Sequence, residues 1–281
     1  MTSPVLSIST EFGRYYVHPT RQSRVPSVTN IKDKKAIKAL TYWAAKEAAQ
    51  YASDNIAKLA TLKPDEIFTL VKSAPFAKTS AKEESSRVGD VVHGWVDRHI
   101  KGERISQAEI ADPFFTDLNG KQEPLTKSGA RTAQNMWRQF GAIVKTYNPK
   151  WVASEFTVWS DTHGYAGTAD WAARIAGALV LGDTKTGKQA YEDTAVQLAA
   201  LANADVILMP DGTERPLPHF DKFAVMHLRP TFARLIPYEH IDEAFIEFLG
   251  LKAVFDFEVK YKDQIMMFAP KIQAPPKSTS K

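Results

Sequence analysis

The sequence contains no cysteine. This absence excludes disulfide bonds, thiolate zinc sites, iron–sulfur clusters and a cysteine nucleophile. Any bound metal must therefore be held by carboxylates, imidazoles and carbonyl oxygens. That set of ligands favours hard cations such as Mg²⁺ or Mn²⁺.

Long apolar runs and a strong excess of charge are also missing. No stretch approaches the roughly 20 apolar residues that a membrane span needs. The amino terminus lacks the charged-then-apolar layout of a signal peptide. We therefore expect a cytoplasmic protein that has no membrane partner. The net charge of +4 permits a polyanionic partner but does not demand one.

The periodicity of apolar residues divides the chain near residue 150. Before it, helical spacing predicts helices over about 34–52, 85–100 and 127–147. After it, short apolar segments broken by turn residues predict a sheet. The expected strands cover about 152–159, 167–175, 178–183, 206–209, 223–228 and 234–237. Two further helices are expected over about 188–204 and 241–261.

These elements predict an α/β protein. A helical amino-terminal region, 1–150, is expected to pack on a core formed by 151–268. The tail over 269–281 holds three prolines with Ser, Thr and Lys, which predicts disorder.

Charged residues interrupt three of the predicted strands. Glu155 lies in the first strand, Asp170 in the second, and Asp183 and Lys185 at the end of the third. Residues 183 and 185 are two apart, so they share one face of an extended chain. Converging charges are costly unless compensated, and a divalent cation between carboxylates would compensate them. The cation would also activate water, while Lys185 could orient that water or stabilise developing negative charge.

Two segments in this region resemble the signature of the PD-(D/E)XK nucleases, in the form used by the RecB-like exonuclease branch. In that branch Gly-x-x-Asp stands in for Pro-Asp, and Asp-x-Lys-Thr-Gly is a common second half. Gly167-Thr-Ala-Asp170 and Asp183-Thr-Lys185-Thr-Gly187 match both halves. The general character is that of phage-encoded relatives, which would place the protein in the host cytoplasm.

The resemblance extends to three other positions. Gly89-Asp-Val-Val-His93 matches an upstream segment whose histidine binds metal in the family, and Glu155 matches a glutamate on the first core strand. Gln197 matches a glutamine that contacts substrate. The family usually has a tyrosine four residues later, where this chain has Leu201. The four cysteines of the CRISPR-associated relatives are absent, so no iron–sulfur cluster is implied.

The resemblance implies a restriction-endonuclease-like mixed sheet and a Mg²⁺- or Mn²⁺-dependent deoxyribonuclease. Exonuclease action in phage or bacterial DNA recombination, repair or processing is favoured, with RNA as an alternative substrate. His93, Asp170, Asp183 and the Thr184 carbonyl would bind metal. Lys185 would activate the water, and Glu155 would hold the metal or one of its waters. The sequence does not predict the oligomeric state.

Other interpretations of the same residues stay open. Gly182–Gln189 nearly satisfies the phosphate-binding pattern G-x-x-x-x-G-K-[S/T], which would indicate an ATPase. However, Gln189 replaces the hydroxyl that would bind Mg²⁺, and Asp183 would repel a triphosphate. A catalytically silent nucleic-acid-binding relative is a third reading. Residue by residue, Asp183 and Lys185 could be a surface ion pair, His93 a packing residue, and Gln197 part of a polar helix face.

Overall fold

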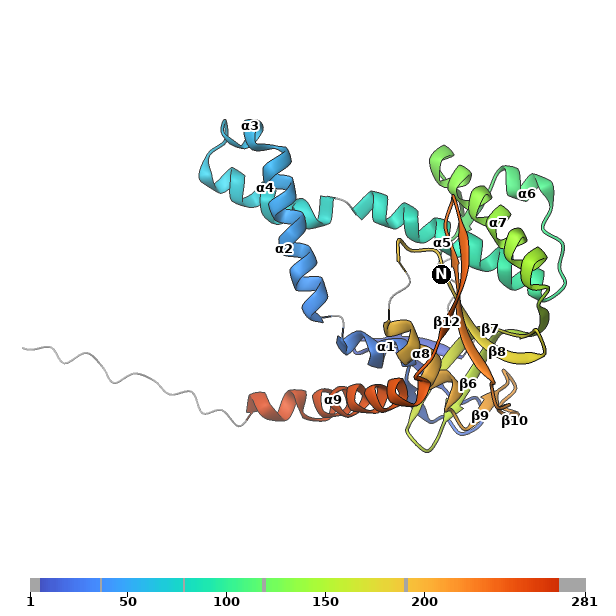
Figure 1. The fold of residues 1–281 in the computed structure, drawn as a ribbon. Coiled ribbons are helices and arrows are strands. Elements are labelled where there is room, and N and C mark those ends of the chain that lie inside the picture. The colour runs from blue at the N-terminus through green and yellow to red at the C-terminus, as the bar shows by residue number, and fades with distance from the viewer. Residues whose placement is uncertain (1–5, 36, 78, 118–119, 190–191, 268–281) are drawn as a thin grey trace, which may run out of the picture.

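The computed structural model describes most of the chain (Figure 1). The described residues are 6–35, 37–77, 79–117, 120–189 and 192–267. The expected disordered tail, 269–281, lies outside them.

A seven-stranded mixed sheet forms the centre of the molecule, which confirms the α/β class. Its strand order is β10-β9-β6-β7-β8-β11-β12. Strands β6, β7 and β8 form an antiparallel meander, β8 pairs with β11 in parallel, and β11 pairs with β12 antiparallel. The strands are β6 (Lys150–Ser160), β7 (Tyr165–Ile175), β8 (Ala178–Lys185), β9 (Val206–Leu208), β10 (Glu214–Pro216), β11 (Lys222–Leu228) and β12 (Ala233–Tyr238).

The middle of the sheet is apolar on both faces because helices cover both. Ala172 and Leu181, which are register partners, belong to the core beneath α8 (Asp193–Ala202) and α9 (Ile241–Met267). The next pair, Ala173 and Val180, belongs to the opposite core, beneath α5 (Thr79–Ile100) and α7 (Lys127–Tyr147). Successive side chains along each strand therefore pack against opposite helical layers, one on each face of the sheet.

The amino-terminal region is not uniformly helical, so this expectation was wrong for residues 7–26. Their strands form a three-stranded sheet, followed by α1 (Val28–Lys32). Val28 and Ile31 are buried in the same core as α8. Residues before 150 thus complete the core that was assigned to 151–268, because α1 fills space beside β7 and α8. The small strands are β1 (Ser7–Thr10), β2 (Gly13–Val17) and β3 (Arg24–Pro26).

Other segments lie outside the two helical layers. Helices α2 (Ile37–Asp54) and α4 (Pro64–Ala77) form a hairpin that projects away from the sheet, and the far end of α9 projects as well (Figure 1). The remaining short elements are η1 (Asp33–Lys35), α3 (Ile56–Leu59), α6 (Gln107–Ala111), β4 (Phe114–Thr116) and β5 (Gln122–Pro124). Within the described ranges, no helix has both the length and the apolar character of a membrane span.

Candidate active site

Three acidic residues lie side by side across β6, β7 and β8. The β6–β7 ladder pairs Ser154 with Trp171 and Phe156 with Ala169, which leaves Glu155 opposite Asp170. The β7–β8 ladder ends with Trp171 paired to Gly182. One step further along each strand, Asp170 lies opposite Asp183. We call Glu155, Asp170 and Asp183 the acidic row.

Regular strand geometry breaks at the acidic row. Glu155 has a φ of +48°, a left-handed conformation that is uncommon for a residue with a side chain. Ser154 beside it donates to the Asp97 carboxylate at 2.5 Å and to the Asp170 carbonyl at 3.3 Å. Backbone strain of this kind persists only where the surroundings enforce it, and it concentrates at functional sites.

Asp183 is the most enclosed member of the row, with a side chain only 3% exposed. The Lys185 ammonium lies 2.9 Å from Oδ1 and 2.7 Å from Oδ2, and Gln197 donates to Oδ1 at 3.1 Å. The contact at Oδ2 is an ion pair without hydrogen-bond geometry, so this buried oxygen has no directed donor. Gln197 therefore contacts a member of the row, whereas the family resemblance implied contact with substrate.

The acidic row makes its own negative charge unfavourable. Burial, followed by the nearby Asp170 carboxylate, raises the pKa of Asp183 to about 6. Desolvation of the carboxyl group by the surrounding protein raises the pKa of Glu155 to about 8, and the carboxylates of Asp170 and Asp97 add to the increase. The residue nevertheless keeps solvent-exposed surface. Burial disfavours the Lys185 ammonium, but Asp183 and Asp170 outweigh it, so the pKa of Lys185 lies above its ordinary value.

Helix α5 brings His93 to the row, as the resemblance implied. His93 Nδ1 lies 3.6 Å from Asp170 Oδ2, slightly beyond hydrogen-bond length. Asp97 and Lys101 lie four and eight residues after His93, on the same face of the helix. The Lys101 ammonium lies 2.8 Å from the Asp97 carboxylate, so the two form an ion pair. Sequence reasoning missed both residues. The regular spacing of His93, Asp97 and Lys101 was the signal that could have revealed them.

The end of β8 is fixed by contacts that no local motif predicts. The Thr184 N–H donates to Asp170 Oδ2 at 2.8 Å, and the buried Thr184 hydroxyl has no partner among the described residues. His227 Nε2 on β11 lies 2.9 Å from the Gly187 carbonyl, and Arg229, just after β11, donates to the Thr186 carbonyl at 2.5 Å. These contacts hold the chain just after Lys185.

A further residue near the row comes from β12. Burial, despite the opposing hydrogen bond from Thr194, raises the pKa of Tyr238, and the Asp183 carboxylate adds to the increase. Tyr238 therefore lies close enough to the row to feel its charge. At the position where the family usually has tyrosine, Leu201 is buried in the core.

The fit of this site to a divalent cation rests on its donors. Within the described residues, no three histidine or acidic side chains converge closely enough to hold a metal ion. Carboxylates crowded together, one with a buried oxygen that lacks a directed donor, are nevertheless the hard ligands that Mg²⁺ and Mn²⁺ prefer. At present Lys185 supplies the positive charge at Asp183.

Neither a scan against protein-family models nor a search of the curated proteins gives a match for this chain.

Proposed function

We propose that the chain is a metal-dependent deoxyribonuclease of the PD-(D/E)XK superfamily, with a restriction-endonuclease-like core and exonuclease action. One observation carries the proposal. The acidic row spans three adjacent strands, and the Lys185 ammonium lies against its most buried member. Burial and the neighbouring carboxylates raise the pKa values of Asp183 and Glu155, and carboxyl groups perturbed in this way cluster at functional sites.

The site residues named from the sequence each have a place in phosphodiester hydrolysis. A bound Mg²⁺ or Mn²⁺ would supply charge neutralisation and an acidified water. Asp170 and Asp183 would hold the ion, with His93 and the Thr184 carbonyl as further ligands. Gln197 orients Asp183, and Glu155, whose raised pKa suits proton transfer near neutral pH, would accept the proton of the attacking water. Lys185 would stabilise negative charge on the phosphate.

The conformation of Gly182–Lys185 disfavours the ATPase alternative. These residues lie in strand β8, whereas a phosphate-binding loop would wrap its amides around the ligand. The Trp171 ring occupies the space that a Gly182 side chain would fill, so Gly182 serves close packing inside the sheet. Helix α8 begins at Asp193, not at Lys188 as expected, so no described helix N-terminus follows Lys188 directly. Residues 190–191 lie outside the described chain.

The proposal is tested with end-labelled linear DNA and closed circular DNA, each with Mn²⁺ or with EDTA. We expect the linear form alone to be degraded, and only with Mn²⁺. Asp183→Asn should abolish degradation, while Asp211→Asn, which alters an exposed turn residue, should leave it unchanged. Persistence of both DNA forms with Mg²⁺ and Mn²⁺ would refute the nuclease. DNA binding without any cleavage would favour the silent relative.

A thermal melt separates the ATPase alternative. Mn²⁺ should raise the melting temperature by binding the folded state, whereas ATP should not. A melting shift with ATP that disappears in Lys188→Ala would reverse this ranking.

A further inference from the structure

Helix α7 carries a basic stripe that sequence reasoning left unexplained. Lys127, Arg131, Arg138 and Lys145 fall within about 40° of arc, because each residue advances about 100° around a helix. All four are exposed and together span roughly 27 Å of helix. The helix contains neither aspartate nor glutamate. We call these four residues the basic stripe.

The amino-terminal half of the basic stripe does not stabilise its own helix, although Lys145 in the last turn is favourably placed in the helix dipole. Lys127 and Arg131 are like charges at i and i+4, and Lys127 lies at the positive end of the helix dipole. Within the described residues, none of the four forms an ion pair; Arg138 donates only to the Asn135 side chain. By contrast, Arg87, Arg98, Lys101 and Lys121, in neighbouring segments, all pair with carboxylates. A stripe of uncompensated cations fits a polyanion.

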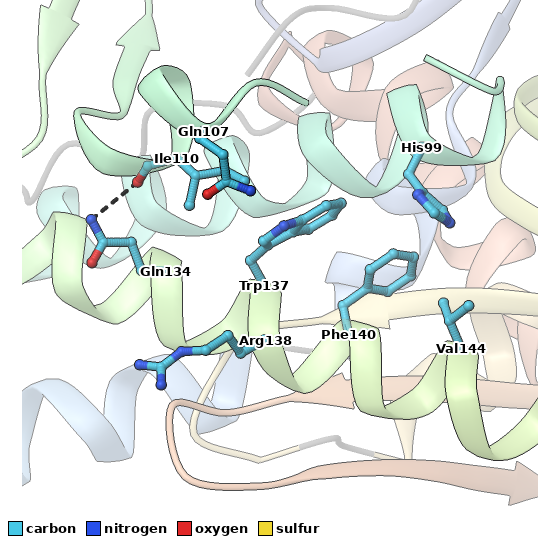
Figure 2. Close-up of a pocket in the computed structure, with 9 residues that line it drawn as sticks. His99, Gln107, Ile110, Gln134, Trp137, Arg138, Phe140 and Val144 are labelled. Atoms are coloured by element: carbon cyan, nitrogen blue, oxygen red, sulfur yellow. Dashed lines mark hydrogen bonds between the residues drawn. The ribbon is translucent and has the colours of Figure 1, made fainter. Parts of the chain in front are cut away.

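A cavity of about 550 Å³ adjoins the stripe along one side. Three residues that line the cavity lie on or next to the helix face that carries the basic stripe: Gln134, Arg138 and Gly141. Figure 2 shows the Trp137 and Phe140 rings on α7 beside the His99 ring, with Arg138 pointing away from the rings.

One ring of the cavity, Trp137, suits a flat aromatic ligand because it is only half-buried. Phe140 is 1% exposed and supports Trp137 from the core, stacking on it at 5.1 Å with an interplanar angle of 22°, and the His99 ring meets both edge-on. Burial lowers the pKa of His99, which favours the neutral ring. The Gln107 side chain at the rim is exposed and offers an amide donor and acceptor. An unpaired nucleobase of any identity can stack on an aromatic ring such as that of Trp137.

We propose that α7 is a single-stranded DNA site, with phosphates on the basic stripe and one unpaired base in the Trp137 cavity. A single strand could bind the basic stripe and the cavity together, since it offers anionic phosphates and unstacked bases at the same time. Because α7 packs against α5, which carries His93, the site lies on the helical layer that reaches the acidic row. The choice of DNA as the bound polymer rests on the proposed function.

The test measures binding of the full chain to labelled oligothymidylate by fluorescence anisotropy, in EDTA and at several salt concentrations. Arg131→Ala/Arg138→Ala should weaken binding about tenfold and reduce the slope of log K against log salt by about 1.4. The control, Lys58→Ala/Lys63→Ala, changes the same net charge at exposed positions on or near the projecting hairpin. If both double variants weaken oligothymidylate binding equally, the basic stripe is not the phosphate site.

The cavity is tested with 2-aminopurine in the oligonucleotide, whose fluorescence falls when the base stacks. Trp137→Leu should abolish this quenching. Because that variant could disturb packing with Trp95, Gly141→Leu provides a second variant: nothing lies within 4 Å of an added Cβ at Gly141, so leucine can fill the cavity from an exposed position. Quenching that persists in folded Gly141→Leu would overturn the base site.

The same measurements separate this inference from the proposed function. Binding in EDTA requires no cleavage, so binding at α7 in a chain that never degrades DNA would leave the inference standing and the nuclease refuted. Cleavage with full activity and unchanged single-strand affinity in Arg131→Ala/Arg138→Ala would refute the α7 site alone. Duplex bound as tightly as single strand, without quenching, would likewise refute the α7 site.

Discussion

The acidic row and the basic stripe gather charge in opposite ways. Members of the row are crowded, and Lys185, Gln197 or His93 contacts two of them. The stripe is exposed and, within the described residues, has no ion pair. Closely spaced, partly buried charges interact strongly, whereas well-separated exposed charges are screened by salt and act almost independently. Single changes should therefore have severe, non-additive effects in the row and graded, additive effects in the stripe.

The largest effect is expected at Lys185. Lys185→Ala should lower the single-turnover cleavage rate about a hundred- to a thousandfold at any Mn²⁺ concentration, because charge stabilisation is lost. The double variant with Asp183→Asn should be no worse than Asp183→Asn alone, since the two groups act as a unit. Lys188→Ala, three residues away on an exposed segment, should cleave like the parent. Multiplying losses in the double variant would show that the row does not act as one unit.

A smaller, metal-dependent effect is expected at His93. His93→Ala should lose about ten- to a hundredfold of the rate at limiting Mn²⁺ and recover much of it when Mn²⁺ is raised, because imidazole is a replaceable ligand. A Mn²⁺ titration under single-turnover conditions measures this recovery. His219→Ala, which removes an exposed imidazole, is the control. Parental cleavage by His93→Ala at limiting Mn²⁺ would make His93 a packing residue.

Desolvation and charge repulsion at Glu155 predict a pH-dependent stability. The folded-state pKa of Glu155, about 8, lies above its unfolded value, so its contribution to stability is present at low pH and lost as pH rises through 8. In EDTA, Glu155→Gln should therefore melt like the parent near pH 5 and higher than the parent at pH 9. After allowance for solvent screening, the gain is about 1 kcal/mol, or about 2–4 °C. A gain that is the same at both pH values would contradict the raised pKa of Glu155.

The smallest effects are expected for single residues of the basic stripe. Arg131→Ala and Arg138→Ala should each weaken oligothymidylate binding about threefold, and the double variant should lose the product of the two. Raising the salt concentration should shrink each loss. If the loss of affinity in the double variant differs from the product of the two single losses, the residues of the stripe are coupled. The contrast with the acidic row would then disappear.

Strong local patterns predicted much of this architecture. The helix over 127–147 was located correctly because its apolar spacing is regular and Asn148-Pro149 ends it. Strands β6, β7 and β8 were predicted because β-branched and apolar runs lie between turn residues. The β1–β3 sheet was missed because its short strands, such as Gly13–Val17, lack a clear alternation.

The candidate site divides in the same way. The spacing of Asp183 and Lys185 predicted that they lie together, and the structure places them in contact. The opposition of Glu155 and Asp170 depends on strand register, which sequence spacing alone does not fix. The contacts of His227 and Arg229 with the segment after β8 require a parallel crossover of about 40 residues, so no local pattern could reveal them.

The meander that carries the acidic row has a consequence for folding kinetics. Only short turns, near 161–164 and 176–177, separate β6, β7 and β8, so these strands can pair early, before distant α5 docks. Three carboxylates would then meet in a nascent hairpin and slow its formation whenever they are ionised. Refolding measured by stopped-flow fluorescence should accordingly be faster near pH 5 than near pH 8. An equal or slower rate at pH 5 would mean that the row assembles after the folding barrier.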